Sequence, residues 1–162
     1  MKEKAREFAV ERHGEQKYGD LPYFVHLDEV AEIASKYGDK AITVAYLHDV
    51  VEDTETELEE IENEFDSFTS KCVAVLTDEP GANRKERKAK TYDKMAKVGG
   101  ELELALLVKA ADRLANLRAC VAQDNTSLLS MYKNEHPTFK SSVYRSNLCE
   151  TLWKEIEAIV NA

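Results

Sequence analysis

Residues 39–53 read DKAITVAYLHDVVED, and the first half of this run is apolar on nearly every side of a helix. Such a segment is typical of a helix in the middle of a helical bundle, and Asp39 is placed to cap it. The run ends with four polar groups: His48, Asp49, Glu52 and Asp53. At about 100° per residue these groups lie within an arc of about 140°, so one helix can turn all of them towards one cavity.

Apolar residues recur at helical spacing along almost the whole chain, and no period-two alternation is long enough to predict a sheet. Gly14 and Gly38 are expected to end the first two helices, and Thr56 with Glu59 forms a capping box for a fourth. Further helices are predicted at about 67–76, 84–98 and 101–122, in a short segment before His136-Pro137, and in one or two segments after it. The sequence predicts an all-α bundle of about eight or more helices.

Length and composition fit one domain that spans residues 1–162, with 43% hydrophobic and 33% charged residues. The net charge of −9 argues against sequence-independent nucleic-acid binding, which needs a basic surface. No apolar run is long enough to cross a membrane, and the N-terminal residues lack the apolar centre of a signal peptide. We therefore expect a cytoplasmic protein, and the sequence makes no prediction of its oligomeric state. Cys72, Cys120 and Cys149 form no CxxC pair, so we interpret them as buried thiols.

Three carboxylates crowded beside the imidazole of His48 would repel one another in an apolar interior unless a cation lies among them. A second apolar helix, LLVKAADRLANL, carries Asp112, and His26 ends the segment PYFVH just where the second helix begins. Together with Asp49 these residues would supply two imidazoles and two carboxylates. Such mixed ligands suit manganese, iron or zinc better than calcium and leave open positions for water and substrate.

Each of these features has a simpler interpretation when it is taken alone. A His-Asp pair is often a surface dipeptide, a buried Asp112 can be a helix-to-helix hydrogen-bonding group, and Glu52-Asp53 can be a solvated acidic turn. The stretch RKERKAK can be a solvated helix face, although it could also guide an anionic nucleotide. His13 and His136 can be ordinary surface or loop residues rather than ligands. The joint occurrence of His, His-Asp and Asp, with the last two on apolar helices, favours a metal site.

The order of His26, His48-Asp49 and Asp112 resembles the pattern of the HD superfamily. Within that superfamily, PYFVH resembles a PYI-x-H segment, AYLHDVVEDT resembles A-x-LHD-x-x-EDT, and VKAADRLANLR resembles KLADRL-x-NMR. These three segments are similar to the hydrolase domain of RelA/SpoT enzymes and of small stand-alone hydrolases. The resemblance covers roughly residues 5–120, and helices within 127–161 are expected to complete the bundle and the cleft.

The resemblance implies a Mn²⁺-dependent hydrolase that removes the 3′-pyrophosphate of ppGpp or pppGpp and leaves GDP or GTP. It implies four metal ligands: His26, His48, Asp49 and Asp112. It further implies that Glu52 and Asp53 place and activate the attacking water. The synthetase domain of the long RelA/SpoT enzymes is not in the sequence, so we expect a hydrolase only.

The residues expected to contact the nucleotide depart in part from the family pattern. Lys17 stands where the family usually carries an arginine that stacks on guanine, and lysine lacks that planar surface. Tyr18 is the alternative stacking group, and Asn116 is expected to line the ribose and phosphate side of the cleft. Lys140 and Arg145 are further candidates for phosphate contacts, against the interpretation of their region as a solvated amphipathic helix. Arg113 is open to a structural or a functional interpretation.

Two other functions are compatible with the sequence. An HD fold can hydrolyse other nucleotides, such as ppApp, NADPH or a nucleoside monophosphate, and Lys17 keeps that alternative open. The chain can also be a catalytically silent nucleotide-binding module, although intact Glu52 and Asp53 argue against it.

Overall fold

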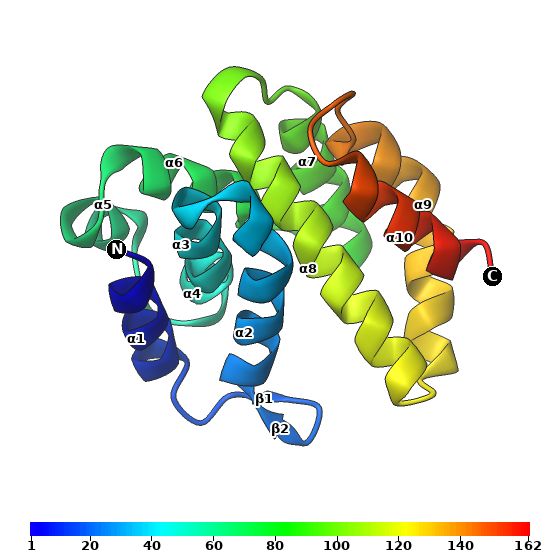
Figure 1. The fold of residues 1–162 in the computed structure, drawn as a ribbon, viewed down its shortest axis with the longest axis horizontal. Helices are drawn as coiled ribbons and strands as arrows, with labels where there is room; N and C mark the ends of the chain where they lie inside the picture. Colours follow the sequence, from blue (N-terminus) through cyan, green and yellow to red (C-terminus); the bar gives the residue numbers. More distant parts are fainter.

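The structure is a computed structural model that describes residues 1–162, and it is built almost entirely of helices (Figure 1). The α-helices are α1 (Lys2–His13), α2 (Tyr23–Ala34), α3 (Asp39–Leu47), α4 (Val50–Asp53), α5 (Leu58–Glu64), α6 (Ser67–Leu76), α7 (Arg84–Ala96), α8 (Glu103–Ala122), α9 (Thr126–Val143) and α10 (Glu150–Val160). Two 3-10 turns, η1 (Ser35–Tyr37) and η2 (Gly100–Leu102), precede α3 and α8. The short strands β1 (Lys17–Tyr18) and β2 (Leu21–Pro22) pair antiparallel in a hairpin. The predicted all-α class is confirmed.

Helix α8 runs through the middle of the molecule and organises the core (Figure 1). Helices α2, α3 and α6 pack on one side of it, and α9 and α10 pack on the other. Its residues Leu106, Leu114 and Leu117 are completely buried. A fully buried leucine stabilises a fold by about 2 kcal/mol, so α8 supplies much of the driving force for the bundle.

The expected single helix over residues 39–53 is divided in the structure. Helix α3 ends at Leu47, and α4 begins only at Val50, after a turn at His48 and Asp49. The His48 imidazole bonds through Nδ1 to the Ala45 carbonyl at 2.6 Å. This carbonyl is the acceptor that a continuing helix would offer to the Asp49 N–H, so the side chain competes with the helix at this point.

Helix boundaries elsewhere are partly as predicted. Gly14 (φ 54°) ends α1 and Gly38 (φ 107°) ends the turn after α2, in backbone conformations that favour glycine. Asp39 is the first residue of α3 and makes no capping bond. The predicted capping box is wrong, because Glu57 precedes α5 and the Thr56 hydroxyl bonds to Arg12 and Thr54 instead.

The predicted stop before His136-Pro137 is also wrong, because α9 continues through the proline to Val143. A proline inside a helix costs about 3 kcal/mol. Burial of Phe139 and Val143 in the core beyond it offsets that cost.

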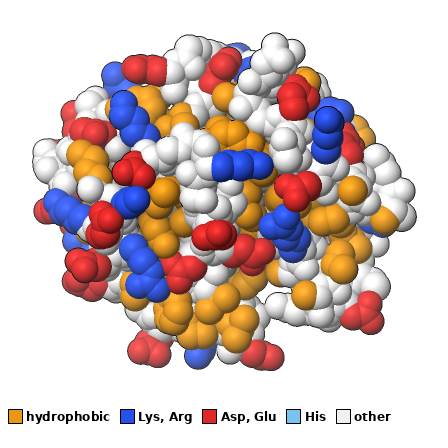
Figure 2. All heavy atoms as spheres, in the orientation of Figure 1, with side chains coloured by type: hydrophobic (Ala, Val, Ile, Leu, Met, Phe, Trp, Pro, Cys, Tyr) orange, Lys and Arg blue, Asp and Glu red, His pale blue; other side chains and the backbone are white.

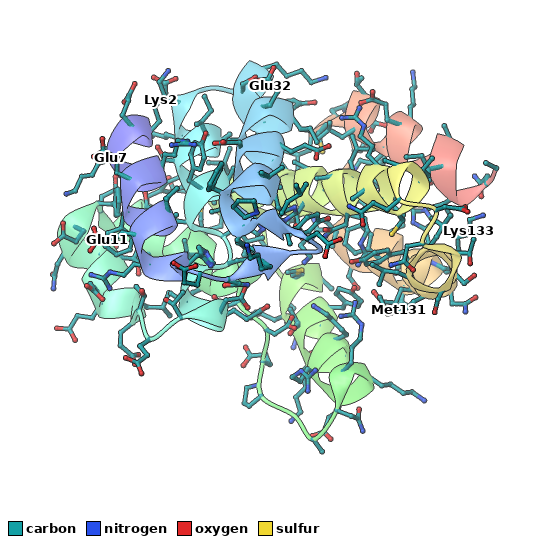
Figure 3. All side chains as sticks on the ribbon, turned by 90° about the horizontal axis from the view of Figure 1, so that it is seen from below. Lys2, Glu7, Glu11, Glu32, Met131 and Lys133 are labelled. Atoms are coloured by element: carbon teal, nitrogen blue, oxygen red, sulfur yellow. The ribbon has the colours of Figure 1, made fainter.

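The face shown in Figure 2 carries charges of both signs, with hydrophobic side chains between them. None of the helices combines the length and the apolar character that a membrane span requires. The three cysteines are free thiols and buried, as predicted. Seen from below, α7 projects from the rest of the bundle, while Glu7 and Glu11 point outward from α1 (Figure 3).

Candidate metal centre and active site

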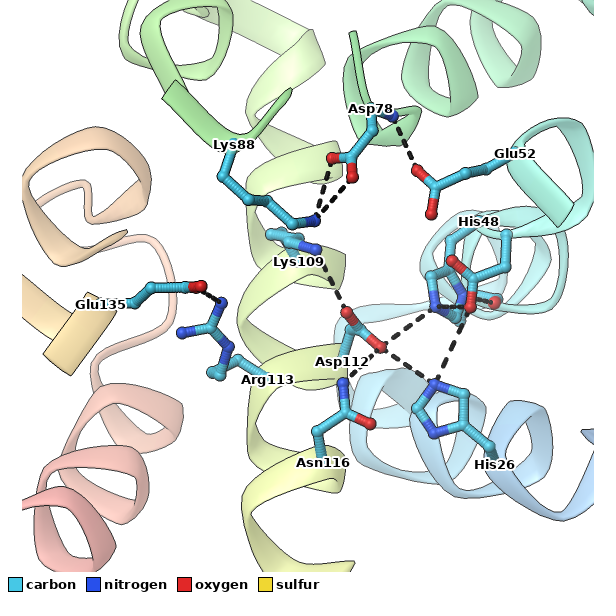
Figure 4. A network of polar contacts seen from close by, with 12 residues as sticks. His26, His48, Glu52, Asp78, Lys88, Lys109, Asp112, Arg113, Asn116 and Glu135 are labelled. Carbon is cyan, nitrogen blue, oxygen red and sulfur yellow. Dashed lines mark hydrogen bonds and ion pairs between the residues drawn. The ribbon is translucent and has the colours of Figure 1, made fainter. Parts of the chain in front are cut away.

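Four side chains from three parts of the fold meet in the interior beside α8 (Figure 4). His26 comes from α2, His48 and Asp49 from the turn between α3 and α4, and Asp112 from α8. One potential ligand atom of each residue lies within 4.8 Å of those of the other three. The structure therefore brings together all four residues expected to bind a metal.

The two imidazoles present the same nitrogen to the carboxylates. Asp112 Oδ1 lies 3.0 Å from His26 Nε2 and 3.2 Å from His48 Nε2, and Asp49 Oδ2 lies 3.0 Å from His48 Nε2. Because Nδ1 of His48 bonds to a backbone carbonyl, Nδ1 carries a proton, and Nε2 is the nitrogen that could coordinate a metal. A backbone carbonyl behind the ring is a common support of metal-binding histidines. These side chains therefore fit a divalent transition metal.

The charges at this centre are strongly coupled. Burial alone would raise the pKa of Asp112, but Lys109 and His48 hold that pKa well below the usual range. Burial opposes protonation of His48, whereas Asp49 and Asp112 raise its pKa well above the ordinary value. Although burial opposes it, His48 also lowers the pKa of Asp49. Both aspartates are therefore ionised, and the site gathers two negative charges that favour a cation.

Three further side chains hold the ligands in place. The Tyr23 hydroxyl donates to Asp49 Oδ2, Asn116 Nδ2 donates to Asp112 Oδ1 at 3.3 Å, and Lys109 Nζ donates to Asp112 Oδ2 at 3.3 Å. The roles of Tyr23 and Lys109 were not predicted from the sequence. Their positions offered a signal, since Tyr23 lies one turn before His26 in PYFVH and Lys109 lies one turn before Asp112.

Glu52 and Asp53 line a pocket of about 270 Å³ next to this centre. Glu52 Oε1 accepts a hydrogen bond from the Asp78 N–H at 2.7 Å, and Asp53 Oδ2 accepts one from Gln16 Nε2 at 3.1 Å. Burial, reinforced by the charge of Asp49, raises the pKa of both carboxyl groups. Glu52 and Asp53 therefore each have one carboxylate oxygen held by a hydrogen bond from the protein.

The opposite wall of the pocket is cationic. Its basic residues are Arg84 and Lys88 of α7 and Lys109 and Arg113 of α8. Against these four positive groups stand four carboxylates in the same lining: Asp49, Glu52, Asp53 and Asp112. A divalent cation at the histidines would make the pocket positive overall, which suits a phosphate-bearing ligand. The interpretation of RKERKAK as only a solvated face is therefore wrong for Arg84 and Lys88.

The expected nucleotide-binding residues divide into two groups. Tyr18 and Asn116 line the pocket, and the Tyr18 hydroxyl donates to Asn116 Oδ1 at 2.6 Å. The Tyr18 ring also stacks on His26, with centroids 4.5 Å apart. Lys17 is exposed on β1 and is not part of the pocket lining.

Lys140 and Arg145 do not reach the pocket, which corrects the expectation for both. Lys140 Nζ pairs with Glu157 of α10 at 2.5 Å. Arg145 Nη2 donates to the carbonyls of Met95 and Val98 at 2.9 and 3.1 Å, where it satisfies backbone groups at the end of α7. Both side chains are held in structural contacts.

Arg113 and the two remaining histidines are buried. Arg113 Nη2 bonds to Tyr92 and Glu135, and the guanidinium lies over the Phe139 ring. Arg113 also lines the pocket. The structural interpretation of Arg113 thus rests on its contacts, and the functional one on its place in the pocket lining. His136 pairs with Glu157, so the expectation of surface positions for His13 and His136 is wrong.

Comparison with known proteins decides the family. A family model described as an HD domain matches residues 5–135. The chain belongs to the HD domain family. This HD domain is 36% identical over 118 residues to a guanosine-3′,5′-bis(diphosphate) 3′-pyrophosphohydrolase, MESH1, of Danio rerio, covering 68% of this chain and 64% of that protein. It is 37% identical over 120 residues to a guanosine-3′,5′-bis(diphosphate) 3′-pyrophosphohydrolase of Aquifex aeolicus, covering 72% of this chain and 17% of that protein.

The HD domain also resembles a solved structure of a metazoan ortholog of SpoT, described as hydrolysing ppGpp. The TM-score is 0.79 at 24% sequence identity, over 99% of this chain and 93% of that one. At this level of identity the likeness concerns the fold. The chain therefore shares the whole architecture of that structure, while its matched segment spans less than two thirds of the length of the two relatives named above.

Proposed function

We propose that this HD domain is a metal-dependent (p)ppGpp 3′-pyrophosphohydrolase that releases pyrophosphate and leaves GDP or GTP. The observation that carries the proposal is the buried His26, His48, Asp49 and Asp112 centre, flanked by Glu52 and Asp53 and faced by a cationic wall. The activities named for the two relatives support the choice of substrate. In this proposal the whole of residues 1–162 acts as one domain in the cytoplasm, on a small nucleotide rather than on nucleic acid or a membrane.

Mn²⁺ is the proposed metal, held by the two imidazoles and the two aspartates, because mixed nitrogen and oxygen ligands suit a first-row transition ion. When bound, such an ion supplies charge compensation for phosphoryl oxygens and increases the acidity of water. Tyr23, Asn116 and Lys109 keep the ligating carboxylates in place through the bonds described above.

Glu52 is the proposed general base. Its Oε1 is occupied by the Asp78 N–H, so Oε2 is the oxygen that can accept a proton from the attacking water. Burial raises the pKa of Glu52 and makes the carboxylate a stronger proton acceptor near neutral pH. Asp53, held by Gln16, orients the same water for attack on the phosphorus.

The nucleotide is proposed to place its phosphates between the metal ligands and the basic side chains Lys88 and Lys109. Tyr18 and Asn116 contact the nucleoside on the other side, and Lys17 contacts it at the exposed rim. A different nucleotide, such as ppApp or NADPH, is the second candidate. The observation in its favour is that Lys17 lies outside the pocket lining and offers no planar surface for guanine.

Product analysis tests the proposal directly. The purified protein is incubated with Mn²⁺ and, separately, ppGpp, ppApp, NADPH and deoxynucleoside monophosphates, with a chelator control for each. Conversion of ppGpp to GDP and pyrophosphate, stopped by the chelator, is the expected result. Cleavage of another nucleotide alone would reassign the substrate, and cleavage of none would favour a binding module.

A further inference from the structure

His13, the last residue of α1, is buried next to the active site but is neither a metal ligand nor part of the pocket lining. Its side chain lies in a short chain of hydrogen bonds that ends on Asp53. His13 Nδ1 is 2.8 Å from Gln16 Oε1, and Gln16 Nε2 is 3.1 Å from Asp53 Oδ2. A buried polar residue thus reaches a proposed active-site carboxylate through one intermediate amide.

The direction of each bond follows from the chemistry of the groups. An ionised carboxylate only accepts hydrogen bonds, so the Gln16 side chain must turn its NH₂ group to Asp53 and its oxygen to His13. Because that oxygen only accepts, His13 Nδ1 must carry a proton. His13 Nε2 is buried with no hydrogen-bond partner, so a proton placed only there would leave both ends of the ring unsatisfied.

The surroundings fix both members of this chain. The His13 ring packs on Tyr23, with centroids 4.6 Å apart and planes tilted by 32°. The Gln16 N–H donates to the His13 carbonyl at 3.0 Å, and the Gln16 carbonyl accepts from the Tyr23 N–H at 3.1 Å. The backbone of Gln16 is therefore held on both sides, and its side-chain amide is bonded to His13 at its oxygen and to Asp53 at its nitrogen.

We propose that His13 and Gln16 are positioning residues that hold Asp53 in the orientation needed for hydrolysis. The proposal rests on the proposed function for the role of Asp53. His13 fixes the Gln16 amide, and the Gln16 amide fixes one oxygen of Asp53 while the other oxygen faces the attacking water. Loss of such a supporting bond is expected to lower turnover about tenfold to a hundredfold.

Three variants separate the hydrogen bonds from general packing. Gln16→Met keeps the length of the side chain and removes its polarity. His13→Leu removes the donor, whereas His13→Asn keeps an N–H donor on the Cγ atom, where Nδ1 stands in histidine. Gln123→Met is the matched control, because Gln123 is exposed and lies outside the pocket lining. Thermal unfolding of each variant reports whether the fold is intact.

The first readout needs no substrate. Nitrogen NMR of the His13 ring in the full chain is expected to show the proton on Nδ1, and this signal is expected to change in Gln16→Met. The second readout is turnover, for which Gln16→Met and His13→Leu should lower kcat with little change in KM, while His13→Asn retains most of the activity. Mn²⁺ affinity should be unchanged in Gln16→Met, because Gln16 touches none of the four proposed ligands.

A His13 proton found only on Nε2, or unaffected by Gln16→Met, would overturn the proposal. Normal kcat in a folded Gln16→Met protein would overturn it as well. If the wild-type protein cleaved no nucleotide, the proposed function would fail, and the NMR measurement would still decide whether His13 and Gln16 form the bond that positions Asp53.

Discussion

Lys109 Nζ lies 3.3 Å from Asp112 Oδ2, one turn earlier on α8, and both side chains are almost completely buried. The other oxygen of Asp112 faces His26 and His48. Asp112 is thus shared between a lysine on one side and the proposed metal centre on the other. Lys109 and a bound metal ion would each compensate the negative charge of Asp112. Removal of Lys109 should therefore make the stability of the fold depend more strongly on the metal ion.

Lys109→Met is expected to destabilise the metal-free protein strongly, by about 3 kcal/mol, because the buried carboxylate of Asp112 loses the lysine cation that lies 3.3 Å from its Oδ2. Mn²⁺ should restore much of the loss by supplying charge at the other oxygen. The measurement is thermal unfolding with Mn²⁺ and with chelator. Lys97→Met is the control, because Lys97 follows α7 directly and forms an exposed pair with Asp93. An equal loss under both conditions would contradict the shared role of Asp112.

Asp49→Ala is expected to abolish Mn²⁺ binding, because it removes a ligand and leaves Tyr23 without its acceptor. Glu52→Gln should bind Mn²⁺ normally and lose turnover by about a hundredfold or more, since general bases contribute this much. Calorimetry with Mn²⁺ and initial rates with ppGpp provide the two measurements. Full Mn²⁺-dependent activity in Asp49→Ala would refute the ligand set.

The pH dependence of hydrolysis should respond to Lys88. Glu52 accepts a proton only when it is ionised, so activity falls as the pH drops through its pKa. Burial and Asp49 raise that pKa, whereas the Lys88 ammonium lowers it. Lys88→Met is therefore expected to move the acidic limb of the kcat/KM profile to higher pH. An unmoved limb would place the titrating base elsewhere, and Lys97→Met should leave the profile unchanged.

Much of the site was predictable because its ligands interrupt apolar helices. His48, Asp49 and Asp112 stand among residues that have to be buried, and that conflict is visible in the sequence. The supporting contacts were not predictable from the sequence. Gln16 meets Asp53, and the Asp78 N–H meets Glu52, only where the folded chain brings distant segments together. Their geometry depends on tertiary packing that no local pattern encodes.

The basic residues were the least predictable part of the site. Lys140 and Arg145 carry the right charge for phosphate, but Lys140 pairs with Glu157 and Arg145 binds backbone carbonyls. Lys88 belongs to a polar helix that looked solvated, yet it faces the pocket. The charge of a residue in the sequence does not show which group it will contact in the folded protein.

Glu135 accepts hydrogen bonds from Arg84 and Tyr92 of α7 and from Arg113 of α8. Glu135→Gln is expected to lower the free energy of unfolding by about 2 kcal/mol at neutral pH, because bonds to a charged acceptor are lost. Glu155→Gln, at an exposed pair with Arg118, should change it by less than about 1 kcal/mol. Denaturant unfolding measures both.

The difference in free energy of unfolding between wild type and Glu135→Gln should also depend on pH. Although burial opposes it, Tyr92 and Arg113 lower the pKa of Glu135 in the folded state. The charge therefore stabilises the fold above the pKa of the unfolded chain, and this contribution is lost as the pH falls through the folded-state pKa. The gap between wild type and Glu135→Gln should shrink towards acid. A constant gap would show that the effect is one of packing.

Helix α10 lies beyond the matched family segment but contributes Leu152, Trp153 and Ile156 to the core. Each buried side chain of this kind stabilises a fold by about 2 kcal/mol. Their combined loss is comparable to the whole stability of a typical domain. Residues 1–146 alone should therefore show no cooperative thermal unfolding, whereas a chain lacking only residues 161–162 should unfold as the wild type does. A stable 1–146 fragment would contradict the single-domain proposal.

The turn between α3 and α4 also limits how this centre can be transplanted. Consecutive side chains on a regular helix diverge by about 100°, and His48 and Asp49 both reach one point from a turn at which α3 has ended and α4 has not yet begun. A designer who copied the His-Asp dipeptide onto a continuous helix would lose the bond between His48 Nδ1 and the Ala45 carbonyl, because the helix itself would use that carbonyl. The transferable unit is the interrupted backbone together with the Ala45 carbonyl that the imidazole occupies.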